Sequence, residues 1–400
     1  MSEIKVLFVD HQQDNAELKE LISSDSSHSR KIDLVSSGGE ALKYLEKGKY
    51  DVIVSEMAMP EMDGAQLMKR VRTLYPGIVR FIYSGSTDRE QVLQTVGYVH
   101  RYVARPCSPD RFWKIVDNSL GLRSMIFNEE MHTKIASVGA LPSPPELYNE
   151  LIKELQSEDT SLRHVADLIK KDIGITAKLL QMINSAFFGL PTHIESTFHA
   201  VKLLGLDTVK SLVLTAGVFN QFQDNDIPGI TIDSIYNRSL AVGTSARHIA
   251  NVLSLPTRQL EDSLMAGMLH DVGKLVMLTN FPKELGEAVQ MEKSKRIPLN
   301  AAINEVLGVS DAAIGAHLLS LWGLPDSILE AVALRYLPRQ TPAPIINVLT
   351  SVHLAYALDC DHYRKIKDEN ESAIDREYLE KLDLITVLPN LRNFCMAATS

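Results

Sequence analysis

The 400-residue chain is poor in cysteine, and it lacks both a signal region and a long apolar run. Its three cysteines, Cys107, Cys360 and Cys395, lie far apart and show neither metal-type spacing nor a disulfide framework. They fit a reducing compartment, so we expect a cytoplasmic protein. Asp10 interrupts the first apolar run, which excludes a signal peptide there. No stretch approaches the length that spans a bilayer, and no membrane association is expected.

An excess of positive charge is also missing. The chain has 41 Lys and Arg residues against 50 Asp and Glu residues, which gives a formal net charge of -9. General binding of nucleic acid needs clustered cations, so no nucleic-acid partner is expected. With 45% hydrophobic and 23% charged residues the chain is globular. Its length predicts two or three domains.

Residues 1–121 alternate short apolar runs with helical segments. The expected strands are 5–10, 32–35, 50–55, 79–84 and 102–104, and the expected helices are 15–22, 39–45, 62–74, 89–96 and a last one from about 108. This alternation predicts a doubly wound α/β domain with a five-stranded parallel sheet. Ligands of such sheets bind at the carboxyl ends of the strands. The residues expected at that edge are Asp10, His11, Glu56, Ser84 and Arg105.

The same segment resembles the receiver domain of two-component response regulators. The resemblance rests on the turn of residues 57–64, on Ser84-Gly85 and on Arg105-Pro106, and Tyr102 corresponds to the switch aromatic of the family. It implies that an active receiver holds magnesium with two acids after its first strand and an aspartate after its third. That aspartate accepts phosphate.

This chain departs from the receiver pattern at three positions. His11 replaces the second acid, Glu56 replaces the phosphoacceptor, and Arg105 replaces a lysine. The loss of a carboxylate weakens a hard-cation site, and glutamate reaches one methylene too far for in-line geometry. We expect Glu56 to pair with Arg105 and to hold the domain in a conformation that needs no phosphate. The alternative is a decayed pocket in a domain that serves as a rigid spacer.

The remaining chain is helical in its periodicity. Residues 111–136 are expected to form one long helix or two short ones, and residues 122–138 a helical connector. Gly139 and the Pro-rich run of residues 141–145 open an all-α domain over 139–400, which includes a C-terminal helical extension. Its expected helices are 163–171, 175–185, 196–204, 208–219, 235–253, 259–279, 298–308, 310–321, 326–335, 345–358 and 378–385.

His270 and Asp271 stand side by side in the apolar stretch 264–275. Such a pair resembles the metal-binding centre of the HD phosphohydrolases, although a hydrogen-bonded core histidine is the simpler interpretation. Segments 141–145, 184–189 and 322–325 resemble the HDOD domain, which is related to those enzymes. The resemblance implies a fold like that of the HD enzymes. It also implies a role in signalling, because most HDOD members lack the metal ligands.

The positions that correspond to the ligands of active HD enzymes are called the relic HD site here: Arg238, His270, Asp271, Arg335, Tyr336 and Tyr356. Only His270 and Asp271 keep the residue types of that pattern. Two neighbouring ligands do not hold a divalent metal, and an inward arginine would repel it, so we expect no metal and no catalytic residue. Asp271 should instead form a structural salt bridge, with Arg238 as its candidate partner.

Asn184 and Ser185 form a second polar pair in an apolar segment. We expect them to cap or cross-link neighbouring helices, and a ligand pocket is the alternative.

These observations predict a signal-transduction regulator in which a degenerate receiver is joined to a non-catalytic HDOD domain. Its expected partners are other signalling proteins, a homodimer is left open, and no cofactor is expected. Two alternatives are a metal-dependent phosphodiesterase that acts on a nucleotide such as a cyclic dinucleotide, and a sensor that binds a small ligand in the relic HD site.

Overall fold

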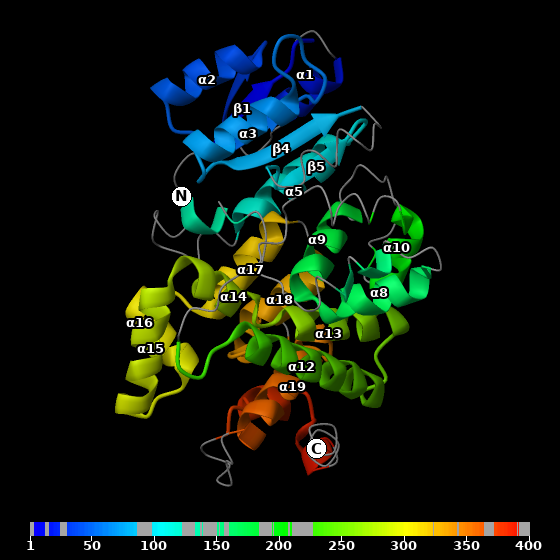
Figure 1. Ribbon diagram of the computed structural model, residues 1–400, viewed down its shortest axis with the longest axis vertical. Coiled ribbons are helices and arrows are strands. Elements are labelled where there is room, and N and C mark those ends of the chain that lie inside the picture. The colour runs from blue at the N-terminus through cyan, green and yellow to red at the C-terminus, as the bar shows by residue number, and fades with distance from the viewer. Residues whose placement is uncertain are drawn as a thin grey trace.

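The structure is a computed structural model. It describes residues 4–12, 16–24, 30–85, 98–121, 133–136, 138, 150–151, 153–155, 160–183, 194, 196–206, 209, 227–322, 324–341, 344–363, 372–389 and 391. An α/β domain lies at one end of the molecule and an all-helical domain at the other (Figure 1). The predicted helix 89–96, most of the predicted helix 208–219, most of the connector and the Asn184–Ser185 pair lie outside the described residues.

The N-terminal domain contains a parallel sheet of five strands in the order β2-β1-β3-β4-β5. The strands are β1 (Ile4–Val9), β2 (Arg30–Val35), β3 (Val52–Ser55), β4 (Val79–Ser84) and β5 (Arg101–Ala104). β1 lies between β2 and β3, and its Val9 is in register with Ser55 of β3. The residues that follow these two strands, Asp10 and Glu56, therefore leave the sheet next to each other, where such sheets bind ligands.

Helices cover both faces of the sheet, as predicted for a doubly wound domain. They are α1 (Ala16–Ser23), α2 (Gly38–Lys47), α3 (Gly64–Leu74) and α5 (Pro109–Gly121). Phe8 of β1 packs against Phe112 of α5, with ring centroids 5.8 Å apart, in the cluster that also contains residues of α1. Leu7 belongs to the cluster on the opposite face with residues of α2 and α3. This alternation follows from the period of two along a strand.

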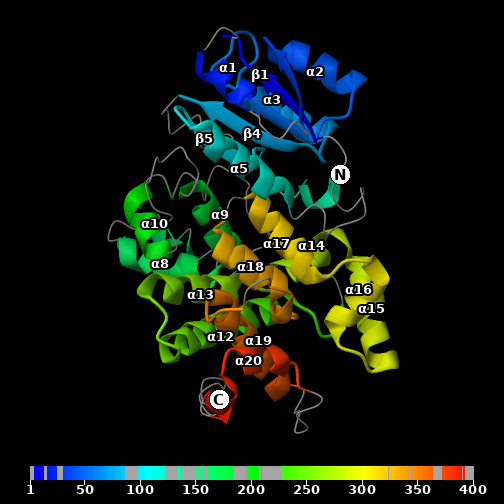
Figure 2. The same cartoon turned by 180° about the vertical axis from the view of Figure 1, so that it is seen from behind.

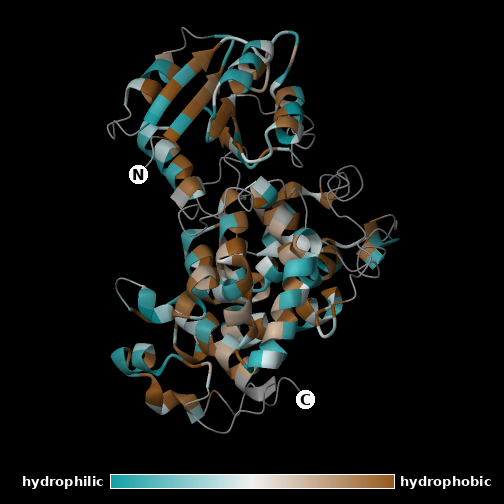
Figure 3. Cartoon of the chain, turned by 90° about the vertical axis from the view of Figure 1, so that its left-hand side faces the viewer, coloured by the Kyte–Doolittle hydropathy of each residue, from teal (hydrophilic) through white to brown (hydrophobic). Residues whose placement is uncertain are grey.

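Helices make up the second domain, and none of its described residues forms a strand. They are α8 (Leu162–Lys171), α9 (Ile173–Ile183), α10 (Thr197–Leu204), α12 (Ile232–Val252), α13 (Thr257–Leu269), α14 (Val272–Asn280), α15 (Pro282–Lys295), α16 (Leu299–Leu307), α17 (Asp311–Leu321), α18 (Asp326–Leu334), α19 (Val348–Tyr363) and α20 (Arg376–Lys381), with short 3-10 turns at Pro338–Gln340 and Ile385–Val387. In Figure 3 hydrophobic segments run through the helices in the middle of this domain. Within the described part of the chain, no helix is long and apolar enough to cross a membrane.

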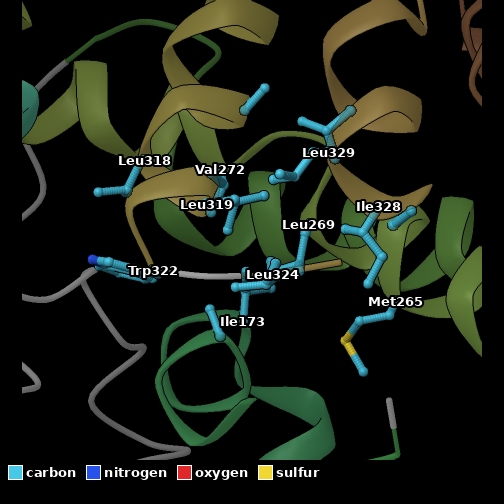
Figure 4. Close-up of a cluster of buried hydrophobic side chains, with 14 of the residues drawn as sticks. Ile173, Met265, Leu269, Val272, Leu318, Leu319, Trp322, Leu324, Ile328 and Leu329 are labelled. Atoms are coloured by element: carbon cyan, nitrogen blue, oxygen red, sulfur yellow. The ribbon is translucent and has the colours of Figure 1, made fainter. Parts of the chain in front are cut away.

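Two predictions for this domain were wrong. Helix α15 was not expected, although Pro282 at its first turn and Lys293 and Lys295 in its last turn are ordinary helix-end signals. The single helix expected over residues 259–279 is interrupted, because α13 ends before His270 and α14 begins after Asp271. Leu269 and Val272, on the two sides of this break, pack with Leu318 and Leu319 of α17 (Figure 4).

The break in the helix is explained by a close approach between α14 and α17. A Cβ atom on Gly273 would lie only 1.9 Å from the carbonyl oxygen of Asp311. The backbones of the two helices therefore touch where α14 begins. A straight continuation of α13 is replaced by a junction at Asp271, whose backbone has φ -98° and ψ 13°.

Candidate functional site

The receiver pocket is built around Arg105, which follows β5. Its Nη2 donates to Asp10 Oδ2 at 2.7 Å, and its Nη1 lies 3.3 Å from Glu56 Oε2. The Ser84 hydroxyl donates to Glu56 Oε1, and the Met57 N–H donates to the same oxygen at 2.7 Å. Both oxygens of Glu56 are thus engaged, and the expected Glu56–Arg105 ion pair is present.

The other two predicted pocket residues differ in how closely they join this network. His11 lies at the rim, with a third (33%) of its side chain exposed and Nδ1 3.9 Å from Asp10 Oδ1. Tyr102 is buried. Burial raises the pKa of Tyr102 to about 12, although a hydrogen bond with Ser84 acts in the opposite direction. Tyr102 therefore belongs to the chain of contacts that runs through Ser84 and Glu56 to Arg105.

Two further residues, Tyr83 and Glu17, complete the pocket, and no sequence motif marks them. The Arg105 guanidinium lies over the Tyr83 ring, 4.4 Å from its centroid, and the Tyr83 hydroxyl donates to Glu17. Glu17 also accepts the N–H of Cys107 at 3.1 Å. The Tyr83 ring thus contacts Arg105, and Glu17 anchors the Tyr83 hydroxyl.

The pocket around Arg105 does not fit the magnesium ion that the receiver resemblance implies. Such an ion needs carboxylate oxygens free to coordinate it. Here the Arg105 guanidinium already contacts Asp10 and Glu56, and His11 supplies no carboxylate.

The relic HD site forms at the junction between α13 and α14. Asp271 is buried, and its Oδ1 accepts from Lys274 Nζ at 2.7 Å. The same oxygen lies 3.5 Å from Arg335 Nη2 and 3.3 Å from His270 Nε2. The expected partner Arg238 is present, with Nη1 3.8 Å from Asp271 Oδ2. Lys274, which the sequence analysis did not select, is therefore the nearer cation.

Asp311 is the second acid at the centre of the domain. Arg335 Nη2 donates to Asp311 Oδ2 at 2.6 Å, and the Tyr336 hydroxyl donates to the same oxygen at 2.9 Å. Lys274 Nζ lies 4.0 Å from Asp311 Oδ2. We call Asp271, Lys274, Asp311 and Arg335 the buried charge cluster. Asp311 was missed because an acid in the first turn of a helix is usually explained by the helix dipole.

Arg238 and Tyr356 close the site on its outer side. Arg238 Nε donates to Asp359 Oδ2 at 2.7 Å, and its Nη2 lies 2.8 Å from Cys360 Sγ. Its guanidinium lies 5.0 Å from the centroid of the Tyr356 ring. The Tyr356 ring also packs edge-on against Tyr336, at 5.1 Å between centroids. Aromatic rings therefore occupy the space beside the cations.

The charges of the site balance. Three cations, Arg238, Lys274 and Arg335, face three carboxylates, Asp271, Asp311 and Asp359. Burial raises the pKa of Asp271, but the contact with His270 and the charges of Lys274 and Arg238 outweigh it and hold that pKa well below its ordinary value. Burial would lower the pKa of Arg335, yet Tyr336 and the two buried acids raise it. Mutual pairing thus favours the ionised forms of Asp271 and Arg335.

The environment of His270 favours its neutral form. Burial lowers its pKa, and the charges of Arg335 and Arg238 act in the same direction, although Asp271 opposes them. His270 Nδ1 donates to the carbonyl oxygen of Gly267 at 2.6 Å, while Nε2 makes no hydrogen bond. The ring also packs edge-on against Tyr356. The contacts are those of a core histidine.

The residues of the relic HD site do not fit a divalent metal. In the part of the chain that the structure describes, no group of three or more His, Cys, Asp and Glu side chains could hold one. His353 is not a replacement ligand, because Nδ1 binds the carbonyl oxygen of Arg335 at 2.8 Å and Nε2 accepts the N–H of Asp375 at 3.0 Å. At the centre, the Arg335 guanidinium contacts both acids. The structure brings all six predicted residues together and adds Lys274, Asp311, Asp359 and Cys360.

Comparisons with known proteins agree with the two domains. The family model for the response regulator receiver domain matches residues 6–117, and the model for the HDOD domain matches residues 141–338. An uncharacterized protein of Treponema pallidum (strain Nichols) is 24% identical over 228 residues, which are 56% of this chain and 44% of that protein. The hydrogenase transcriptional regulatory protein HoxA of Cupriavidus necator is 36% identical over 78 residues, 19% of this chain and 16% of its own.

Among solved structures, the MmoQ response regulator of Methylococcus capsulatus str. Bath matches with a TM-score of 0.47 and 20% identity, over 57% of this chain and 90% of that one. The chain spans less than half the length of the two curated relatives named above. The receiver and HDOD matches together define the architecture of a signal-transduction regulator. The chain is a response regulator with an N-terminal receiver domain and a C-terminal HDOD domain.

Proposed function

We propose that this response regulator signals without phosphoryl transfer and without hydrolysis. Its receiver holds one conformation in the absence of phosphate, and its HDOD domain binds other signalling proteins. One observation, found in both domains, supports the proposal. Where the family resemblances imply a metal ion, an arginine guanidinium contacts two carboxylates: Arg105 contacts Asp10 and Glu56, and Arg335 contacts Asp271 and Asp311.

In the receiver, Glu56 supplies a permanent negative charge at the phosphoacceptor position. Phosphoryl transfer depends on positioning and on charge stabilisation by several groups at once. Here Ser84 and Arg105, which would stabilise an incoming phosphoryl group, already bind Glu56. The carboxylate thus imitates a phosphorylated aspartate.

In the HDOD domain, the residues at the relic HD site support a role without hydrolysis. Metal-dependent hydrolysis needs a bound ion that activates water. Arg335 is fully buried between the two acids, and the Tyr336 and Tyr356 rings pack beside it. The helical domain is therefore proposed to act through its surface, by protein contact.

Phosphate uptake tests the receiver half of the proposal. The full chain is incubated with acetyl phosphate and magnesium, and intact mass is measured. We expect no adduct on the wild type and little on Glu56→Asp, because components that act as one unit are far from additive. The triple variant His11→Asp, Glu56→Asp, Arg105→Lys should take up much more. Stoichiometric phosphorylation of the wild type at Glu56 would show the proposal to be wrong.

Hydrolysis and binding test the HDOD half. The full chain should not turn over cyclic dinucleotides or generic phosphodiesters with manganese, iron or zinc. Turnover that disappears in Asp271→Ala would establish the phosphodiesterase alternative instead. A partner captured by the full chain should bind equally well with and without acetyl phosphate and magnesium. Binding that appears only after the phosphodonor is added would contradict the phosphate-independent receiver.

A further inference from the structure

The receiver contacts the helical domain through β5 and α5. In both Figures 1 and 2, α5 lies beside the end of α17. Arg101 Nη2 donates to the carbonyl oxygen of Ser320 at 3.2 Å, and the Ser320 hydroxyl donates to the carbonyl oxygen of Asn118 at 2.6 Å. The Asn118 side-chain amide lies 3.3 Å from Asp326 Oδ1. The contact therefore uses the last turn of α17 and the first residue of α18.

The contacts around Ser320 are shielded from water, whereas the Asn118–Asp326 contact is exposed. Ser320 is fully buried. Burial lowers the pKa of Arg101 to about 10, while the charge of Asp326 acts against that shift. A buried donor or acceptor that loses its partner costs more than the bond contributes when it is made. The receiver is thus seated on α17 by a buried hydrogen bond that is costly to break, and the contact with α18 lies at its exposed edge.

The opposite ends of the same two helices form the buried charge cluster. Asp311 is the first residue of α17, and Arg335 directly follows α18; they are joined by the 2.6 Å ion pair. Ser320 lies nine positions after Asp311, which corresponds to roughly 14 Å along a helix. The antiparallel pair α17–α18 therefore ends in the receiver contact on one side and in the charge cluster on the other.

Close backbone packing prevents α17 from sliding independently. At its crossing with α14, Gly315 faces Gly273, and a Cβ atom on Gly315 would lie 2.9 Å from the Gly273 amide nitrogen. Asp271 lies directly before α14. A shift of α17 would therefore displace the acid that pairs with Lys274 and Arg335, because packed interiors deform little.

We infer that α17 and α18 couple the seating of the receiver to the buried charge cluster. Both ends stabilise one placement of these two helices, so a change at either end alters the stability of the other. The inference goes beyond the proposed function, because it concerns communication between the domains and holds whether or not the receiver takes up phosphate.

Hydrogen exchange on the full chain tests the coupling. Ser320→Ala and Asp326→Asn weaken the receiver contact, and Asp311→Asn weakens the charge cluster. The first two changes should raise amide exchange in residues 268–276, and the third should raise it in residues 101–104 and 112–121. We expect a rise of about fivefold or more, the lower end of coupling between linked sites.

Asp117→Asn is the matched control, because it lies next to Asn118 on α5 but pairs with Arg30 inside the receiver and is half exposed. It should leave residues 268–276 unchanged. A rise in amide exchange that is confined to the mutated end would overturn the inference. So would an equal rise in residues 268–276 for Asp117→Asn. If circular dichroism shows that Asp311→Asn unfolds, Ser320→Ala and Asp326→Asn decide the outcome.

Discussion

At the scale of single residues, Arg335 is the most deeply buried charged side chain of the relic HD site. Its guanidinium is fully buried, and it contacts Asp311, Asp271 and the Tyr336 hydroxyl. The removal of charges from water is expensive, and mutual pairing has to offset that cost. The cluster should therefore tolerate the loss of a whole pair better than the loss of one partner.

The change Asp311→Asn should destabilise the folded chain by about 3–5 kcal/mol, because it leaves Arg335 without its nearest carboxylate. Urea unfolding measures the effect. Glu287→Gln, on the exposed side of α15, is the control and should change the free energy of unfolding by less than about 0.5 kcal/mol.

A double-mutant cycle sharpens this prediction. Asp311→Asn combined with Arg335→Met removes both charges, so the pair should cost clearly less than the sum of the two single changes. If the changes in the free energy of unfolding of the two single variants add strictly in the double variant, the 2.6 Å contact contributes no coupling energy.

His270 should make stability depend on pH. Its pKa is lowered in the folded chain by burial, whereas the unfolded chain should titrate near the ordinary value of about 6.5. Below about pH 6.5 the unfolded state then binds more protons, so stability falls as the pH falls, by at most about 1.4 kcal/mol per pH unit. His270→Gln should flatten this dependence in urea titrations between about pH 7.5 and pH 5. Parallel profiles for wild type and variant would mean that His270 titrates alike in both states.

At the scale of elements, the junction between α13 and α14 depends on a glycine. Gly273→Ala would push a methyl group into the α17 backbone, and overpacking of this kind typically costs about 1–3 kcal/mol. Gly286 in α15 has no heavy atom within 4 Å of a Cβ atom, so Gly286→Ala should stabilise by about 0.5–1 kcal/mol. Thermal unfolding of the two variants compares them directly, and the same sign for both would contradict the account of the junction.

The elements also show what the sequence could predict. The strands were found to within two residues, because most of them are short apolar runs, and β4 matched at both ends. The break between α13 and α14 was not predicted, because the apolar period continues through residues 264–276. The reason for the break lies in α17. Helix α15 was missed because only Leu285, Ala288 and Val289 are buried in it. Such a narrow stripe gives a weak periodic signal.

The candidate sites were predictable to the extent that a motif marks them. Glu56, Arg105, His270 and Asp271 occupy motif positions, and the structure brings each of them into its expected site. Lys274, Asp311 and Asp359 have no such marker. Their roles come from the packing of α14, α17 and α19 around Asp271, and single-sequence patterns do not specify which helices meet.

At the scale of the whole molecule, the receiver is integrated with the helical domain. One buried hydrophobic cluster contains Phe8 and Phe112 of the receiver and continues into the helices of the second domain. At the junction, Arg80 donates to the carbonyl oxygen of Ala136 at 2.9 Å, and His100 contacts the same oxygen. These contacts fix how the receiver is oriented. A fixed orientation suits a regulator that is proposed to present the same surface with and without phosphate. The domain boundaries 1–121, 122–138 and 139–400 stay predictions.

Equilibrium dialysis of the full chain against Mn²⁺ tests the central claim, that arginines occupy the places of the metal ions in both domains. We expect that the wild type retains no ion above the buffer concentration. We also expect that the triple variant His11→Asp, Glu56→Asp, Arg105→Lys gains a receiver-bound ion, because it adds a carboxylate at position 11 to those at positions 10 and 56 and removes the guanidinium. An ion that is retained by the wild type and lost in Asp10→Asn or Asp271→Asn would contradict the claim.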